Sequence, residues 1–187
     1  IDLNAQGNLY YQQNNQQQVA YNAFKSPHEI KEQGKDHIRF QYNAFEGRSH
    51  RFYGGFEEDI LQRNNRKHYA FDGSMEITHD KTTDTTVFIS FLGGDAYTAP
   101  VVWRTQSTAS VTNEGYHHLH RDHLNSIVLI TGENGVVEEK RHFDAWGNTV
   151  KLTDGNDNPL QNFRIIARGY TGHEHLESVG LIHMNGR

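Results

Sequence analysis

Hydrophobic and polar residues alternate along this chain in short runs rich in Val, Ile, Thr, Tyr and Phe, each bounded by Asn, Gly or Lys-rich turns. The runs lie at residues 7–11, 16–21, 27–30, 37–43, 49–53, 68–71, 75–79, 86–92, 99–103, 124–131, 136–143 and 149–152. Runs of about four to eight residues, spaced about 8–12 residues apart, are typical of a meander of β-hairpins. The pattern predicts an all-β fold, with helix only in short pieces at 55–62 and 174–179.

The clearest hairpin turn is Gly132-Glu133-Asn134-Gly135, which lies between two strongly β-prone runs. Asn and Gly accept the positive φ angles that a tight hairpin demands. Weaker turn signals of the same kind are Gly54-Gly55, Asp72-Gly73, Gly93-Gly94 and Gly147-Asn148. These positions predict chain reversals between neighbouring strands.

One unit recurs imperfectly: an aromatic residue, then Asn or Asp, then a short spacer that ends in Gly. It occurs at residues 42–48, 71–73 and 143–148. The aromatic ring covers a sheet face, the Asn or Asp side chain caps the turn, and Gly supplies backbone freedom. Such repetition indicates an array in which each hairpin buries its face against its neighbours.

Composition limits the thickness of the core. The hydrophobic fraction is 35% and the mean hydropathy is -0.81, whereas roughly 45–50% apolar usage is ordinary for a globular domain. Aromatic residues nevertheless make up 11% of the chain, which excludes disorder along its whole length. The net charge of -5 and a pI near 6.2 exclude a general attraction to nucleic acid or anionic lipid.

Other compositional features exclude whole classes of site. The chain has no cysteine, so disulfides, thiolate metal sites and a cysteine nucleophile are excluded. No apolar run approaches the roughly 18 residues that a membrane-spanning helix needs. The first residue is Ile1 rather than Met, from which we expect an excised piece of a longer protein.

Three blocks of sequence resemble the Rhs/YD-repeat family. They are residues 116–127 (YHHLHRDHLNSI), 143–148 (FDAWGN) and 168–187 (RGYTGHEHLESVGLIHMNGR), and they occur in the order that the family shows. The resemblance is close over 116–187, which is similar to the start of the repeat-associated core. Residues 1–115 resemble degenerate YD repeats, so the resemblance implies a division between 1–115 and 116–187.

The resemblance implies a role in encapsulation. Family members are long chains whose strands spiral into a hollow β-cocoon that holds a C-terminal toxin and is delivered from a bacterial cell. The partners so implied are the rest of the shell, the toxin cargo, a secretion spike or toxin-complex component, and a cognate immunity protein. No cofactor is implied. The family usually has Gly at the position of Asn125, and Asn tolerates left-handed backbone angles, so we expect that turn to survive.

The resemblance also implies one auxiliary catalytic residue. In many family members the core is an aspartyl autoprotease, in which two Asp act with an Arg a short distance upstream. Arg187 stands at the position of that Arg, while the Asp pair would follow it. Two carboxylates that share a proton supply both acid and base, and a nearby cation shifts their pKa values. This chain is therefore not expected to catalyse by itself.

The histidines offer an alternative, a metal-dependent hydrolase or nuclease. The cluster consists of His117, His118, His120, Asp122 and His123. On a strand, His118 and His120 share one face and His117 points to the other, so two imidazoles can bind Zn²⁺, with His173 or His175 as a third ligand. Without an HExxH spacing, the favoured interpretation is structural. A surface adhesion module is a third hypothesis.

The remaining charged groups are interpreted as structural. His173-Glu174-His175 has the composition of a general base with an orienting carboxylate, but a turn before the packed face of Leu176, Val179 and Leu181 is favoured. The basic residues Arg48, Arg51, Arg63, Arg66 and Lys67 have Glu57, Glu58 and Asp59 nearby, which favours a solvated outer surface over a nucleic-acid site. The pairs Arg121–Asp122 and Arg141–Asp144 are expected to be exposed and worth little.

Overall fold

The chain folds as one long antiparallel meander. The computed structural model describes residues 2–3, 9–13 and 17–184. Fourteen strands form a single sheet in sequence order, and a separate hairpin of two strands follows. The sheet strands are β1 Asp2–Leu3, β2 Leu9–Gln13, β3 Gln17–Tyr21, β4 Pro27–Glu32, β5 Asp36–Tyr42, β6 Arg48–Tyr53, β7 Asn65–Tyr69, β8 Met75–Asp80, β9 Thr85–Leu92, β10 Val101–Ser107, β11 Thr112–Arg121, β12 Ile127–Gly132, β13 Val137–Phe143 and β14 Thr149–Asp154.

The predicted all-β meander is confirmed. Helical structure in the described part of the chain is limited to three short 3-10 turns: η1 Ile60–Gln62, η2 Tyr170–Gly172 and η3 Glu177–Val179. The predicted helical piece at 55–62 shrinks to η1. The piece at 174–179 is half wrong, because its first half is the strand β15 Glu174–Leu176, which pairs with β16 Leu181–His183. No helix in the described ranges is long and apolar enough to cross a bilayer.

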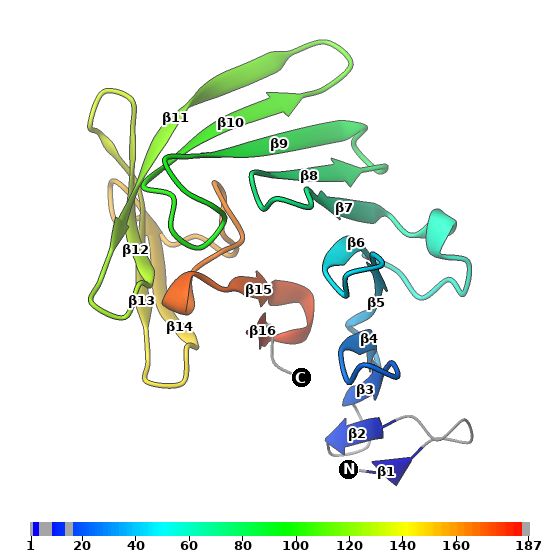
Figure 1. The fold of residues 1–187 in the computed structure, drawn as a ribbon. Helices are drawn as coiled ribbons and strands as arrows, with labels where there is room; N and C mark the ends of the chain where they lie inside the picture. The colour runs from blue at the N-terminus through cyan, green and yellow to red at the C-terminus, as the bar shows by residue number, and fades with distance from the viewer. Residues whose placement is uncertain (1, 4–8, 14–16, 185–187) are drawn as a thin grey trace.

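The sheet is strongly curved, and the chain returns into the curve (Figure 1). Strands β3 to β7 form one side of the curve, β8 to β11 run across it, and β12 to β14 form the other side. The hairpin of β15 and β16 lies inside the concavity, between the two sides. Right-handed twist accumulates along a sheet, and each hairpin adds one more strand to it, so the meander leaves a concave face that later residues fill.

Five turns share one construction, in which an Asx side chain caps the chain reversal. The capping residues are Asn22, Asn43, Asp122, Asp144 and Asp154. In each turn the side-chain oxygen accepts hydrogen bonds from the backbone N–H groups two and four residues later. The residue three positions after the cap has positive φ, and its N–H donates to the carbonyl of the capping residue. Local hydrogen bonds of this kind set the turn without help from the rest of the fold.

Two of the three predicted repeat units, at 42–48 and 143–148, adopt this turn. In the unit at 71–73, Asp72 instead accepts hydrogen bonds from the N–H and hydroxyl of Ser74. The positive φ of the first unit falls on Glu46 rather than on Gly47. The turn at Asn125 survives as expected, with φ 70°. The hairpin at 132–135 also forms, and its positive φ lies at Gly135.

We expect Asn43→Ala to destabilise the protein by about 1 kcal/mol, because the backbone N–H groups of Phe45 and Gly47 lose their shared acceptor. Asn113→Ala is the matched control, because Asn113 is exposed on β11. Urea unfolding monitored by tryptophan fluorescence measures both changes. Equal stability of the two variants would contradict the capping role.

Candidate functional site: a buried ion cluster under the C-terminal segment

Residues 155–184, here called the C-terminal segment, complete both parts of the hydrophobic core. Ile166 packs with one set of buried residues, which comprises Ile89, Phe91, Ala96, Ala99, Val102, Leu119, Ile127 and Ile130. Leu176 and Val179 pack with a second set, which comprises Val19, Ile30, Ile38 and Phe40. In the described residues, no other large sheet packs against the fourteen-stranded sheet. The C-terminal segment, which includes the hairpin of β15 and β16, covers these apolar side chains instead.

Between the two parts of the core lies a carboxylate surrounded by cations. Glu174 is fully buried, and its oxygens lie 2.8 Å from Arg48 Nη2, 3.2 Å from Arg51 Nη1 and 2.7 Å from Lys67 Nζ. The hydroxyl of Tyr69 also donates to Glu174, at 2.9 Å. The three cations hold the pKa of Glu174 well below its usual range, although burial alone would raise it. Glu174 is therefore an ionised carboxylate inside the fold.

A second buried carboxylate, Glu76 on β8, extends the cluster. Its oxygens lie 2.6 Å from Lys67 Nζ and 2.6 Å from Arg168 Nη2. Arg168 belongs to the C-terminal segment, as Glu174 does, so ion pairs cross between the segment and the sheet in both directions. Arg168 also donates to the carbonyl of Gly172. We call these residues the ion cluster: Arg48, Arg51, Lys67, Tyr69, Glu76, Arg168 and Glu174.

Strand register explains why the sheet needs the carboxylate of Glu174. Arg51 on β6 lies directly opposite Lys67 on β7, and Tyr69 lies opposite Glu76 on β8. Two like charges in a cross-strand pair destabilise a sheet. Once buried, they need compensation from a carboxylate. Glu174 contacts both cations, so the C-terminal segment neutralises a repulsion that the sheet creates.

Further polar contacts fasten the C-terminal segment along its length. Arg141 on β13 is buried, pairs with Glu139 at 2.6 Å and donates to the carbonyls of Ile166 and Arg168. Glu139 also accepts the backbone N–H of Arg164. Farther along, Ser178 donates to Asp36 at 2.6 Å, and Gln17 donates to the carbonyl of Val179 at 3.0 Å. These contacts hold an irregular stretch of backbone against the concave face.

Two sequence-based expectations about charge are wrong. The basic residues were expected on a solvated surface, yet Arg51, Arg63 and Lys67 are buried, and of the five only Arg66 is exposed. Arg63 donates to the carbonyls of Gly55 and Glu57. Arg141 was expected to form an exposed pair with Asp144, and it is instead buried with Glu139. Arg51 and Lys67 bind the distant Glu174, whereas the partner of Arg141 lies two residues earlier on the same strand.

The predicted histidine cluster does not converge. His117 lies toward the buried face and contacts Glu138 at 2.5 Å, whereas His118 and His120 are exposed on the other face, as the strand alternation predicts. His120 contacts the hydroxyl of Thr131 at 2.9 Å. In the ranges that the structure describes, no three His, Asp or Glu side chains are grouped so that they could hold a metal ion.

His173, Glu174 and His175 have separate surroundings. His173 contacts Thr171 at 2.8 Å and packs edge-on against Tyr97. His175 packs between Phe143 and Phe163. The backbone here is the strand β15 rather than the predicted turn, and the packed face of Leu176, Val179 and Leu181 is present. Arg187, the predicted auxiliary catalytic residue, lies outside the described residues.

The arrangement acts as a fastening. The acidic and basic groups of the ion cluster are paired with one another, so the cluster holds the C-terminal segment against the sheet. The sequence did not indicate Glu76, Glu139 or Arg168 as members of a site. The pairing of Arg51 with Lys67, which implies a distant carboxylate, depends on the register of β6 and β7 and was not visible in the sequence, where the predicted run began at residue 68.

Comparison with known proteins supports the fold. No protein-family model and no curated protein matches the chain. The structure of the Photorhabdus luminescens Tc holotoxin pore, with a mutation in TccC3, matches 94% of the chain with a TM-score of 0.65 and 16% identity. The crystal structure of TcdB2-TccC3 matches 87% with a TM-score of 0.61 and 14% identity. This chain spans 8% of the matched chain in each case.

Proposed function

We propose that residues 1–187 form part of the wall of an Rhs-type shell that encloses a toxin. The observation that carries the proposal is the match of the curved meander to the Tc holotoxin pore over 94% of this chain and 8% of that one. A small part of a much longer wall is expected to match in this way. The three sequence blocks that resemble the Rhs/YD-repeat family support the same assignment independently.

An exposed row of apolar side chains supports a place within a larger wall. Five turns at the same end of the meander carry Phe24, Phe45, Phe71, Leu124 and Trp146, which are exposed by 56%, 79%, 76%, 49% and 86%. Alternate turns of an antiparallel meander lie at one end of the strands, so these residues form a rim. The ring centroids of Phe45 and Phe71 lie 5.5 Å apart, and exposed apolar side chains that gather on a surface mark an interaction site. The rim suits contact with a further part of the same wall.

The proposal assigns roles to the two regions of the chain. Residues 1–115 are degenerate YD-repeat strands of the shell, and residues 116–187 begin the repeat-associated core, whose C-terminal segment the ion cluster fastens into the concavity. The toxin follows the core. The partners are the rest of the shell, a secretion spike or Tc-type component, and an immunity protein in the producing cell. Delivery from a bacterial cell follows from this role.

Limited proteolysis of the full-length protein tests encapsulation. We expect the chain beyond the core to resist an added protease, because an intact wall excludes the enzyme. The control is the same downstream segment produced without the wall, which is expected to be digested rapidly. Digestion at equal rates in both samples would overturn the shell proposal.

Intact mass tests the auxiliary role of Arg187. The full-length protein is expected to show a cut downstream of Arg187 that is lost in Arg187→Ala and retained in the control Arg66→Ala, whose side chain is exposed on β7. Retention of the cut in Arg187→Ala would overturn the assignment of Arg187. A parent that stays whole would overturn autoproteolysis, and the proteolysis experiment would still decide encapsulation.

A further inference from the structure

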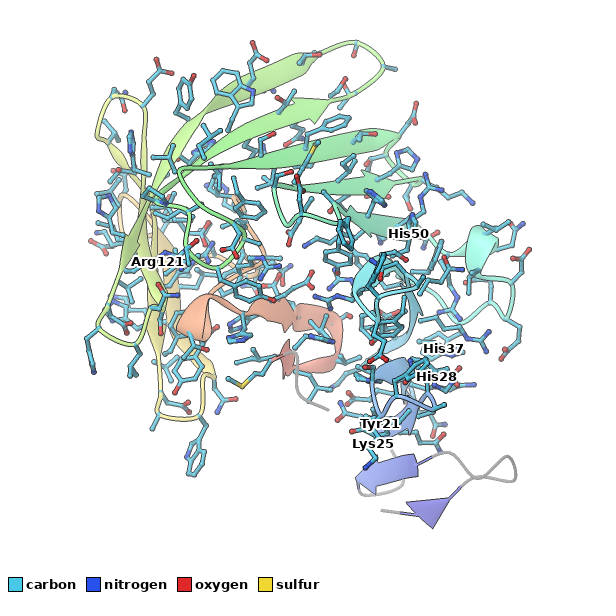
Figure 2. All side chains as sticks on the ribbon, in the orientation of Figure 1. Tyr21, Lys25, His28, His37, His50 and Arg121 are labelled. Carbon is cyan, nitrogen blue, oxygen red and sulfur yellow. The ribbon has the colours of Figure 1, made fainter. Side chains whose placement is uncertain are left out.

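A small cavity between the sheet and the C-terminal segment has an unusual number of cations. It has a volume of about 260 Å³ and lies beside the ion cluster. Four basic side chains line it: Arg51 from β6, Lys67 from β7, Arg104 from β10 and Arg164 from the C-terminal segment. Figure 2 shows how densely side chains fill the concave face in which this cavity lies. The lining carboxylates are Glu76 and Glu177.

Two of the lining arginines, Arg104 and Arg164, lie outside the ion cluster, and each has one acidic neighbour beyond salt-bridge distance: Glu138 for Arg104 and Asp154 for Arg164. Within the described ranges, no ion pair joins Arg104 or Arg164 to a carboxylate. Arg104 donates through Nη2 to Gln106 at 2.8 Å, and its buried Nε has no hydrogen-bond partner. Burial lowers the pKa of Arg104, the charge of Glu138 opposes this shift, and the charge of Arg164 adds to it. Because both arginines line the same cavity, their like charges repel each other.

A third lining arginine, Arg51, has a nitrogen that is free to donate a hydrogen bond. Arg51 is 5% exposed, and its Nε also has no hydrogen-bond partner. The two lining carboxylates are already engaged, because Glu76 binds Lys67 and Arg168 and Glu177 accepts the backbone N–H of Phe163. The cavity lining and the ion cluster together contain six Lys and Arg side chains and three carboxylates, while Glu138 and Asp154 act on Arg104 and Arg164 from outside the lining. The cations are Arg48, Arg51, Lys67, Arg104, Arg164 and Arg168, and the carboxylates are Glu76, Glu174 and Glu177.

We propose that this cavity binds a small oxyanion, a phosphate or carboxylate group, between Arg104 and Arg164 and above Arg51. Guanidinium groups bind both kinds of oxyanion through paired N–H donors. The bound anion removes the repulsion between Arg104 and Arg164 and joins the C-terminal segment to β10. Val87, Phe163 and Ile165 also line the cavity, so the apolar part of an organic anion has a surface to contact. This binding does not depend on the proposed shell function.

Thermal unfolding and calorimetric titration of the full-length protein with inorganic phosphate, at constant ionic strength, test the proposal. We expect a saturable rise in Tm, because a ligand that binds the folded state stabilises it. Arg104→Gln and Arg164→Gln are each expected to raise the Kd at least about tenfold, since each removes a charge-assisted contact. Arg66→Gln is the control, because Arg66 is an exposed arginine that does not line the cavity.

A parallel titration with acetate identifies the preferred anion. Saturable binding of phosphate, of acetate or of both, each lost in Arg104→Gln, supports the site and names its ligand class. Arg164 is exposed, so Arg164→Gln folds even if Arg104→Gln does not, and it then carries the test. The proposal is overturned if both anions act no more strongly than chloride. Equal weakening by Arg66→Gln would overturn it as well.

Discussion

Glu174→Gln is expected to destabilise the protein by about 3–5 kcal/mol, the cost of leaving a buried ion pair without one of its partners. The substitution keeps the shape of the side chain and removes the charge that Arg48, Arg51 and Lys67 share. These three cations then lie buried around a neutral amide. The C-terminal segment is expected to loosen first, because Glu174 is its main ionic contact with β6 and β7.

Urea unfolding measures the free-energy change, and hydrogen exchange of the β15 amides measures the loosening. Glu133→Gln is the matched control, since Glu133 is exposed in the hairpin after β12. In a double-mutant cycle, Glu174→Gln combined with Lys67→Met is expected to cost less than the sum of the two changes, because the second removes a stranded cation. A loss below about 1 kcal/mol for Glu174→Gln, in the range of an exposed pair, would contradict this account.

Stability is expected to fall by up to roughly 3 kcal/mol as the pH drops from about 6.5 to 4, because His175 must stay neutral in the fold. Its Nε2 accepts the backbone N–H of Tyr170 at 3.0 Å. Burial, with a smaller contribution from the charge of Arg141, lowers the pKa of His175 to about 4. In the unfolded chain a histidine titrates near its ordinary value of about 6.5. Between these two values the unfolded chain binds a proton that the folded chain does not, so acid favours unfolding.

Stability measured against pH checks this expectation. His175→Gln keeps an acceptor for Tyr170 and removes the titrating ring, so its stability is expected to change less between pH 6.5 and 4. The exposed His118→Gln should keep the wild-type dependence. The pKa values of His37, His50 and His173 are also lowered, mainly by burial, so part of the slope remains in His175→Gln. An unchanged slope in that variant would overturn the assignment to His175.

The Glu174 contribution has a different pH window, which keeps the two predictions separate. Its folded pKa is lowered, so its stabilisation is complete above the ordinary carboxyl pKa and is lost progressively as the pH falls from that value to the folded one. That value lies well below 4.5. Glu174→Gln therefore lowers stability throughout the range in which His175 titrates. Parallel curves for the wild type and Glu174→Gln are the expected result from about pH 6.5 down to about pH 5, above the range in which the unfolded carboxyl titrates.

The sequence by itself determined the features that depend on neighbours along the chain. Alternating runs predicted the meander, because a strand with one buried face needs a period of two residues. The caps at Asn43 and Asp144 were visible for the same reason, since each accepts hydrogen bonds from residues no more than four positions away. Asn125 adopts the left-handed backbone angle of its turn, as expected from the tolerance of Asn for positive φ.

Only the tertiary structure decided which charges are buried and what neutralises them. Lys67 and Glu174 are separated by 107 positions in the sequence, and the local pattern around Lys67 contained nearer acidic residues that predicted a solvated surface. Arg141 pairs with Glu139, two residues earlier on β13, and not with Asp144, because the returning C-terminal segment buries the face of β13 that carries both groups. A buried cation needs a carboxylate or backbone carbonyl groups beside it, and the fold brings Glu174 to Arg51 and Lys67. The curvature of the sheet and the return of the C-terminal segment place these groups side by side (Figure 1).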